Sequence, residues 1–315
     1  MGLVTILDDY QSVALEMADW GAVRERFEIE VHDAHIADAD VLAATLARSQ
    51  VIVAMRERTP FPRSTLERLP DLRLLITTGM ANRSFDVEAA RELGITVCGT
   101  GSAGNAMPEL TIGMIIALLR NFAAEDAAVR AGGWQHTVGV GLSGRTLGVV
   151  GLGRIGIPVA ALARAFGMDV IAWSPSLTAA RAAEHGARAV AKHELFAAAD
   201  VVTIHTPLSE RSRGLVGAAE LAAMRPTAYL INTSRGPIVD ERALVDALRE
   251  GRIAGAGLDV YDVEPLPADH VLRTLPNTLL LPHIGYVTEE AYRVMYRDAV
   301  EDILAWADGA PVREL

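Results

Sequence analysis

The chain is poor in the features that mark disulfide-linked, metal-binding and membrane proteins. It has one cysteine, Cys98, among 315 residues, and aromatic residues make up 5%. A single cysteine excludes a disulfide framework and a cysteine-based metal site, and it favours a reducing compartment. The longest apolar run, residues 110–119, is about half of what a membrane-spanning helix needs. We therefore expect a soluble, cytoplasmic protein.

Basic clusters and targeting signals are also lacking. The formal net charge is −11, and no run of Lys or Arg occurs, which argues against a nucleic-acid or anionic-membrane partner. Asp8 and Asp9 end the first apolar stretch too early for a signal peptide. Ile6 stands where a myristoylation motif needs Ser or Thr. We expect a small molecule, not a nucleic acid or a membrane, as the partner.

Short apolar runs alternate with helical patterns along most of the chain. This alternation is typical of parallel strands joined by crossover helices, and the length favours two domains. The sequence thus predicts an α/β protein with two Rossmann-like or flavodoxin-like domains and parallel sheets. The expected strands lie in residues 3–7, 27–32, 51–55, 72–76, 95–99, 146–150, 169–173, 199–205, 227–233, 253–260 and 277–283.

A glycine turn follows the expected strand at 146–150. Gly151, Gly153 and Gly156 have the G-x-G-x-x-G spacing, with Arg154 and Ile155 between them, and a helical pattern follows. In a dinucleotide-binding turn, the first glycine makes the tight turn, the second lets the backbone approach the pyrophosphate, and the third packs helix on strand. The helix N-terminus would direct its N–H groups at the phosphates. Any tight strand-to-helix turn is the alternative, and the flanking strand and helix favour the dinucleotide interpretation.

The acidic residue that binds the adenosine ribose in such domains is missing. About twenty residues after the glycines stands Trp173-Ser174-Pro175-Ser176, without Asp or Glu. The change removes repulsion against a 2′-phosphate, yet no Arg stands beside Ser174 to bind one. Ser174 could hydrogen-bond either form, so NAD is favoured and NADP stays open.

Three further segments of the chain have open interpretations. Arg56–Pro62 and Thr77–Asn82 each follow an expected strand; they are either substrate loops at the carboxyl edge of a sheet or plain turns. A helix expected over Ala106–Phe122 is apolar on too many sides for a surface helix. It is predicted to lie between domains or to form the core of a homodimer.

Three later strands end in residues that could act together. Arg235 and Glu264 follow the ends of two expected strands, and His283 is the last residue of a third. An arginine can hold a carboxylate and a neighbouring carbonyl oxygen in one plane. A histidine can pass a proton to that oxygen during hydride transfer, and a glutamate beside it would fix the ring and favour its protonated form. Singly, a surface Arg, a Glu before Pro and a loop His are ordinary features.

With these motifs together, the chain resembles the D-isomer-specific 2-hydroxyacid dehydrogenase family over nearly its whole length. The resemblance is carried by GLGRIG (151–156), HTPLSERSRGLV (205–216), INTSRGPIVDE (231–241), GAGLDVYDVEPLP (255–267) and LPHIGYVTEE (281–290). It implies NAD(P)-dependent interconversion of a 2-keto acid and a D-2-hydroxy acid. It also implies a discontinuous substrate domain, residues 1–100 and 287–315, a dinucleotide-binding domain, residues 101–286, and a cleft between them that closes on substrate.

The resemblance also implies roles for single residues. Arg235 would bind substrate, Glu264 would support the histidine, and His283 would be the acid/base catalyst. The backbone of Gly79, Met80 and Ala81 would bind the substrate carboxylate with Arg235. Asp259 would contact the nicotinamide. Further cofactor contacts would come from the glycine turn, from Ser174 and from later strand ends, namely Thr206, Pro207, Thr233, Ser234 and Gly285.

Several departures from the family pattern leave the substrate open. The loop TTGMANRSFD is not the common glycine-rich form, and Tyr286 adds bulk beside His283. Glu264, where a formate dehydrogenase would have Gln, argues against that activity. The remaining histidines form no metal-binding pattern, and His205 is expected to be a strand-end residue near the cofactor. A dinucleotide-sensing regulator without turnover and a different NAD chemistry, such as phosphite oxidation, are the alternatives.

Overall fold

The computed structural model describes residues 1–104 and 106–315. The chain divides into two compact units. Unit 1 comprises Met1–Gly104 and Val287–Leu315, and unit 2 comprises Asn105–Tyr286. Each is an α/β unit built on a parallel sheet, which confirms the predicted fold class. No helix in the described part of the chain is long and apolar enough to cross a membrane.

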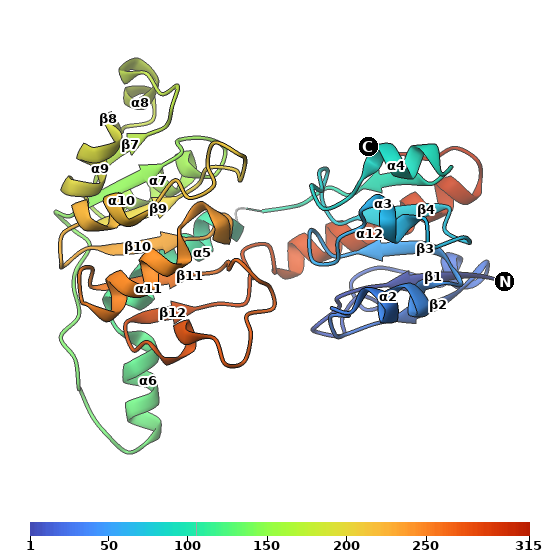
Figure 1. Cartoon of the computed structure of the whole chain (residues 1–315), viewed down its shortest axis with the longest axis horizontal. Coiled ribbons are helices and arrows are strands. Elements are labelled where there is room, and N and C mark those ends of the chain that lie inside the picture. The colour runs from blue at the N-terminus through green and yellow to red at the C-terminus, as the bar shows by residue number, and fades with distance from the viewer. Residues whose placement is uncertain (105) are drawn as a thin grey trace. The chain divides into compact units, whose positions relative to one another are not determined.

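Unit 1 is organised around a five-stranded sheet (Figure 1) with the order β2-β1-β3-β4-β5, the flavodoxin-like arrangement. The pairs between neighbouring strands are parallel. Parallel strands are usually covered on both faces and rich in apolar residues; β4, for example, is buried throughout. The strands are β1 (Gly2–Ile6), β2 (Phe27–Val31), β3 (Ser49–Ala54), β4 (Leu74–Thr77) and β5 (Thr96–Gly99).

Four short helices and one long helix complete unit 1. The short ones are α1 (Gly21–Arg24), α2 (Ala39–Leu46), α3 (Arg63–Leu66) and α4 (Val87–Glu92). The long helix α12 (Glu289–Ala307) begins after Thr288, whose hydroxyl accepts the Ala291 N–H at 3.3 Å. Its buried side chains include Tyr292, Met295 and Ile303. The chain thus returns to unit 1 through α12.

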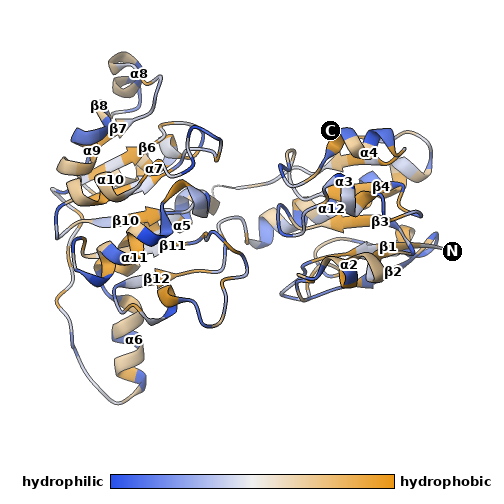
Figure 2. Cartoon of the chain, in the orientation of Figure 1, coloured by the Kyte–Doolittle hydropathy of each residue, from blue (hydrophilic) through white to orange (hydrophobic). Residues whose placement is uncertain are grey.

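Unit 2 has a seven-stranded parallel sheet with the order β12-β11-β10-β9-β6-β7-β8. Its strand order reverses between β6 and β9, the point at which ligands bind in doubly wound sheets. Core clusters within the described part of this unit are made largely of strand and helix residues such as Val150, Ile204 and Leu147. Figure 2 shows the central strands largely in hydrophobic colours. The strands are β6 (Thr146–Val150), β7 (Asp169–Trp173), β8 (Arg188–Ala189), β9 (Val201–Ile204), β10 (Tyr229–Asn232), β11 (Gly255–Leu258) and β12 (Thr278–Leu280).

The helices of unit 2 include the apolar one expected from the sequence. That helix, α5 (Ala106–Leu119), buries Ile112, Ile115, Leu118 and Leu119 in a core cluster of its own unit. Burial of these side chains within unit 2 explains why much of the helix is apolar, and no second subunit is needed to explain it. The other helices are α6 (Phe122–Arg130), α7 (Gly156–Ala165), α8 (Ala179–Glu184), α9 (Lys192–Ala198), α10 (Ala218–Ala223), α11 (Glu241–Arg249), η1 (Gly236–Ile238) and η2 (Val271–Thr274).

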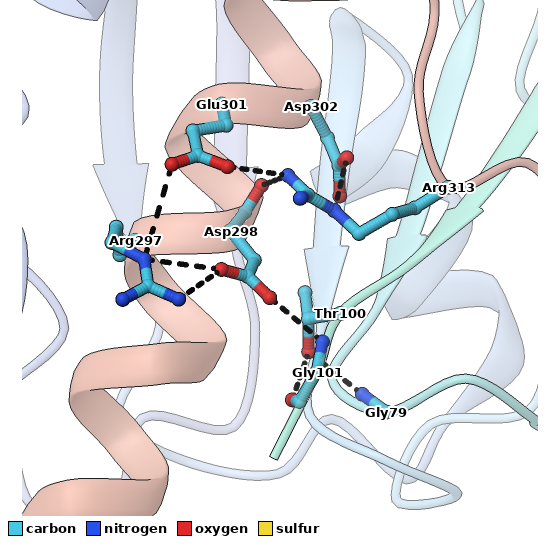
Figure 3. A network of polar contacts seen from close by, with 8 residues as sticks. All are labelled: Gly79, Thr100, Gly101, Arg297, Asp298, Glu301, Asp302 and Arg313. Carbon is cyan, nitrogen blue, oxygen red and sulfur yellow. Dashed lines mark hydrogen bonds and ion pairs between the residues drawn. The ribbon is translucent and has the colours of Figure 1, made fainter. Parts of the chain in front are cut away.

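Unit 1 contains a buried carboxyl group that should make its stability depend on pH. Asp302 is fully buried and its Oδ1 accepts from Arg313 Nε at 3.0 Å (Figure 3). Its Oδ2 has no hydrogen-bond partner among residues 1–104 and 106–315. Burial raises the pKa of Asp302 to about 7; Asp298 and Glu301 act in the same direction, and Arg313 opposes them. The charged form is therefore unfavourable in the folded state.

We expect the protein to gain stability as the pH falls from about 7 towards about 4. In this window Asp302 takes up a proton when folded, whereas an unfolded Asp, with a pKa of about 3.9, does not. Below that window both states are protonated and this gain ends. Asp302→Asn should flatten this part of the dependence of Tm on pH and raise Tm at pH 8. Equal pH profiles for the two proteins in a thermal melt would contradict the assignment.

Candidate functional site

The glycine turn between β6 and α7 is fixed by close backbone contacts. Gly151 has φ +100°, and a Cβ there would lie 2.8 Å from the His205 carbonyl carbon, so a residue without a side chain is required. A Cβ on Gly156 would overlap the Gly151 carbonyl oxygen. At Gly153, by contrast, a Cβ would meet no atom of the described part of the chain within 4 Å. Packing inside the protein explains the first and third glycines, while Gly153 faces space in which a ligand could approach.

Ser174 lies beside this turn. It follows β7 directly, and the preceding residue, Trp173, accepts a hydrogen bond from the Gly151 N–H at 2.9 Å. Ser174 is half-buried, and its carbonyl oxygen accepts from Leu177 N at 3.2 Å. The neighbours in the turn, Arg154 and Ile155, precede α7. The structure thus brings the predicted ribose-side residue and the predicted pyrophosphate turn together.

The ends of β9 and β10 are joined by a hydrogen bond. Ser234 Oγ donates to the Thr206 carbonyl oxygen at 2.6 Å, and Ser212 Oγ donates to the carbonyl oxygen of Pro207 at 2.7 Å. Thr233 is buried, with its Oγ1 3.2 Å from Thr111 Oγ1. The predicted strand-end residues therefore form a connected edge next to the glycine turn, because β9 pairs with β6.

His205 lies at the same edge and is kept neutral. Its Nε2 is 3.0 Å from Thr203 Oγ1, and burial lowers the pKa of His205 to about 3. An imidazole that remains neutral near pH 7 is a poor general acid. This fits the expectation of a strand-end residue rather than a catalyst.

The Arg235 turn packs against the turn that carries Glu264. Arg235 Nη1 donates to the Ser234 carbonyl oxygen at 2.7 Å, and its own carbonyl oxygen accepts from Asn232 Nδ2 at 2.9 Å. A Cβ on Gly236, the next residue, would overlap the backbone of Tyr261. Two turns that are distant in the sequence are thereby held in close contact.

Glu264 and His283, two of the predicted catalytic residues, are in direct contact. His283 Nδ1 lies 2.6 Å from Glu264 Oε2, and both side chains are about one-fifth exposed, 17% for His283 and 22% for Glu264. The other carboxylate oxygen, Oε1, accepts the Tyr261 N–H at 2.9 Å. The ring of Tyr286 meets that of His283 edge-on, with centroids 5.9 Å apart. The glutamate can thus fix the orientation and the tautomer of the imidazole.

Asp259 fixes the backbone that follows His283. The carboxylate is fully buried, and its two oxygens accept the N–H groups of Ile284 at 2.8 Å and Gly285 at 2.9 Å. Burial raises the pKa of Asp259, while these two amides and the charge of His283 act in the opposite direction. A Cβ on Gly285 would overlap the Met107 sulfur. This anchoring of the histidine turn was not predicted, and spacing in a sequence carries no signal for it.

The remaining predicted residues, Gly79, Met80 and Ala81, belong to unit 1. The Gly79 N–H donates to Thr100 Oγ1 at 2.8 Å, and Met80 is 51% exposed. Arg56 lies next to this loop: its Nη1 donates to the Thr78 carbonyl oxygen at 3.3 Å, and its guanidinium fills the space that a Cβ on Gly79 would need. The two loops that the sequence left open as substrate loops are therefore in contact.

Metal binding receives no support from the arrangement of side chains. Within residues 1–104 and 106–315, no three His, Cys, Asp or Glu side chains are grouped so that they could hold a metal ion. Cys98, a free cysteine, is buried.

A doubly wound sheet with a glycine turn at its switch point defines unit 2 as a dinucleotide-binding type of α/β structure. Residues 112–285 match the family described as D-isomer specific 2-hydroxyacid dehydrogenase, NAD binding domain. The chain belongs to this family, which confirms the resemblance found in its motifs. The match to an NAD-binding domain means that the cofactor is a nicotinamide dinucleotide.

Individual relatives agree with the family. The chain is 38% identical over 272 residues to D-3-phosphoglycerate dehydrogenase of Methanocaldococcus jannaschii, covering 85% of this chain and 50% of that protein. It thus spans about half the length of that relative. It is 38% identical over 254 residues to glyoxylate reductase of Thermococcus litoralis, covering 78% of this chain and 76% of that protein.

Solved structures give the same picture. A phosphoglycerate oxidoreductase from Vibrio cholerae o395 superposes with a TM-score of 0.93 at 35% identity, covering 98% of this chain and 100% of that one. The relatives named here are dehydrogenases, reductases or oxidoreductases. They give no support to a dinucleotide-sensing regulator.

Proposed function

We propose that the protein interconverts a 2-keto acid and a D-2-hydroxy acid by hydride transfer with NAD or NADP. The observation that carries the proposal is the 2.6 Å contact between His283 Nδ1 and Glu264 Oε2, at strand ends of a dinucleotide-binding sheet. When bound, the cofactor supplies or accepts a hydride. His283 Nε2 would donate a proton to the carbonyl oxygen during reduction and accept it during oxidation. Glu264, through Nδ1, would hold the ring in the orientation for this transfer.

The substrate carboxylate is assigned to Arg235 and to backbone amides of unit 1. A guanidinium can bind a carboxylate through two parallel N–H groups. Because the Gly79 N–H is donated to Thr100, we assign Gly79 to supporting the loop and the amides of Met80 and Ala81 to contacting the carboxylate. Asp259 would hold the nicotinamide side of the site in place through the turn at Gly285.

The test is turnover by the purified protein. A panel of 2-keto acids, beginning with glyoxylate, is incubated with NADH and NADPH in parallel, and oxidation of the cofactor is followed by absorbance. Inorganic phosphite with NAD is included for the alternative chemistry. Binding of the cofactor without turnover across the whole panel would refute the proposal.

We propose NAD as the preferred cofactor, with NADP also accepted. Ser174 beside the glycine turn can hydrogen-bond a ribose hydroxyl, and no carboxylate stands at this position to repel a 2′-phosphate. The ratio of kcat/KM for the two cofactors in the same assay measures the preference. A ratio strongly in favour of NADPH would overturn it.

Gly153→Ala should weaken cofactor binding without destabilising the fold. An added methyl group meets no protein atom within 4 Å, but in the proposed site it would stand between the backbone and the pyrophosphate. We expect the Kd for NADH to rise about tenfold or more, equivalent to at least about 1.4 kcal/mol, with Tm unchanged. Isothermal titration and a thermal melt give the two quantities.

The matched control is Gly156→Ala. Here the added methyl group would overlap the Gly151 carbonyl oxygen, so we expect the folded state itself to lose stability, by about 1–3 kcal/mol as for other overpacked sites. If Gly153→Ala binds NADH as the wild type does, the pyrophosphate does not lie at this turn.

We propose that the protein is a homodimer and that its contact surface includes α6 and the segment that follows it. Four exposed large apolar residues fall between positions 122 and 138 of the sequence, namely Phe122, Val129, Trp134 and Val138, with Val138 96% exposed. A second subunit would remove this apolar surface from water. Glu125 fixes the segment by accepting from the backbone N–H and Oγ1 of Thr137 at 2.7 and 2.6 Å. The mass from light scattering decides, and a monomer at micromolar concentration would contradict the proposal.

We also propose a cytoplasmic location. The support is that Cys98 is the single cysteine of the sequence, so the protein has no disulfide framework of the kind common in oxidising compartments. Fractionation of the source cells with an antibody to the protein tests this, and recovery outside the cytoplasmic fraction would contradict it.

A further inference from the structure

A chain of hydrogen bonds links the loop at Gly79 to helix α12 within unit 1 (Figure 3). The Gly79 N–H donates to Thr100 Oγ1 at 2.8 Å, and the same hydroxyl donates to the Gly101 carbonyl oxygen at 3.1 Å. The Gly101 N–H then donates to Asp298 Oδ2 at 2.8 Å. A hydroxyl has one proton to donate and can accept at the same time, so the Thr100 hydroxyl is fixed in direction from both sides.

Asp298 is well placed to anchor this chain. Its other oxygen, Oδ1, accepts from Arg297 Nη2 at 2.8 Å and from Arg297 Nε at 3.2 Å, and the residue is only 5% exposed. Its carbonyl oxygen accepts from Arg313 Nη2 at 2.9 Å. Contacts on both sides of the residue thus hold Oδ2 towards Gly101.

The backbone at Gly79 is also confined by its neighbours. Its φ is +113°, and a Cβ on Gly99 would lie 2.7 Å from the Gly79 carbonyl oxygen and 3.1 Å from Met80 Cα. The loop therefore lies directly against the end of β5. Thr100 itself is fully buried, and its N–H donates to the Thr77 carbonyl oxygen at 3.2 Å. The hydroxyl of Thr100 is then the side-chain group that sets the direction of the first amide of the loop.

We propose that Thr100 is a positioning residue for substrate binding. By accepting the Gly79 N–H, its hydroxyl orients the peptide that leads to Met80 and Ala81, whose amides are assigned to the substrate carboxylate. The inference rests on the proposed function and deepens it. It predicts that losing the Thr100 hydroxyl weakens binding of the keto acid. The rate of the chemical step and the affinity for the cofactor should not change, because Thr100 does not reach the reacting atoms.

The experiment compares Thr100→Val with Thr100→Ser. Valine keeps the shape of threonine but lacks the hydroxyl, whereas serine keeps the hydroxyl. For Thr100→Val we expect the KM for the keto acid to rise about tenfold, the effect of losing one hydrogen bond of the stronger kind, with kcat and the Kd for NADH within about twofold of the wild type. Thr100→Ser should restore the KM to near the wild-type value.

Three results would overturn the inference. They are an unchanged KM in Thr100→Val, an equal loss in the valine and serine variants, and a fall in kcat without a change in KM. If Thr100→Val fails to fold, Thr100→Ala takes its place, since a smaller side chain leaves room for water to bind the buried Gly79 N–H. Absence of turnover by the wild type would refute the proposed function itself; normal turnover with an unchanged KM in the variants refutes this inference alone.

Discussion

His283→Ala is expected to lower kcat by about two to four orders of magnitude, the range typical of a positioned general acid/base. The imidazole is held by Glu264 at 2.6 Å through Nδ1, so its orientation is set before substrate arrives. Alanine removes the proton donor and the contact of the imidazole with Glu264 Oε2. Steady-state kinetics with the best keto acid of the panel measure the loss, and the Kd for NADH should remain within about threefold of the wild type.

His270 provides the matched control. It forms a similar pair with a carboxylate, His270 Nε2 with Glu241 Oε1 at 3.0 Å, and its side chain is 19% exposed, close to that of His283. It also caps η2, its Nδ1 accepting from Leu272 N at 3.3 Å. His270→Ala should therefore lower Tm slightly and leave kcat near the wild-type value. Equal losses of kcat in the two variants, or none in His283→Ala, would remove His283 from the mechanism.

The strands could be predicted from the sequence because burial on both faces gives each a run of apolar residues. The run predicted at 72–76 overlaps β4, all of which is buried, and the pair of valines at 149–150 forms the end of β6. The two-residue strand β8 was missed, since Arg188–Ala189 is too short to form a pattern and carries a charge. Helix α6 was also missed: none of its side chains is buried, and its two large apolar residues, Phe122 and Val129, are too few to give the repeat of a core-facing helix.

The site could be predicted in part, and mainly through resemblance. Residue types at strand ends indicate Arg235, Glu264 and His283, but no pattern in the sequence tells which atoms meet. The backbone contacts that hold the site, such as the Tyr261 N–H on Glu264 and the two amides on Asp259, depend on how distant turns pack. Helix α5 was expected between domains or subunits because apolar residues occur on most of its sides. In the structure, several of these side chains are buried in the core of unit 2 itself. Apolar character indicates burial and does not identify the partner.

Arg235→Ala is expected to lower kcat/KM for the keto acid by about two to four orders of magnitude. Two hydrogen bonds between charged groups, each contributing about 1.5–3 kcal/mol, would be lost with the guanidinium, and each 1.4 kcal/mol is about a factor of ten. The neighbouring Ser234 carbonyl oxygen accepts from Arg235 Nη1 at 2.7 Å, which limits the freedom of the side chain. Arg235→Lys should fall between alanine and the wild type, because lysine keeps the charge but lacks the planar pair of donors.

Comparing kcat/KM of the alanine and lysine variants distinguishes binding of the carboxylate through two parallel hydrogen bonds from attraction by a positive charge alone. If lysine restores full activity, only a positive charge is needed, and the proposed two-point binding of the carboxylate is wrong. Arg242, an exposed arginine on α11 of the same unit, is the control: Arg242→Ala should leave kcat/KM unchanged if the loss at Arg235 does not reflect the overall charge of the protein. The Kd for NADH should also be preserved in Arg235→Ala, because the guanidinium is assigned to the substrate; loss of cofactor binding instead would move Arg235 to the cofactor side of the site.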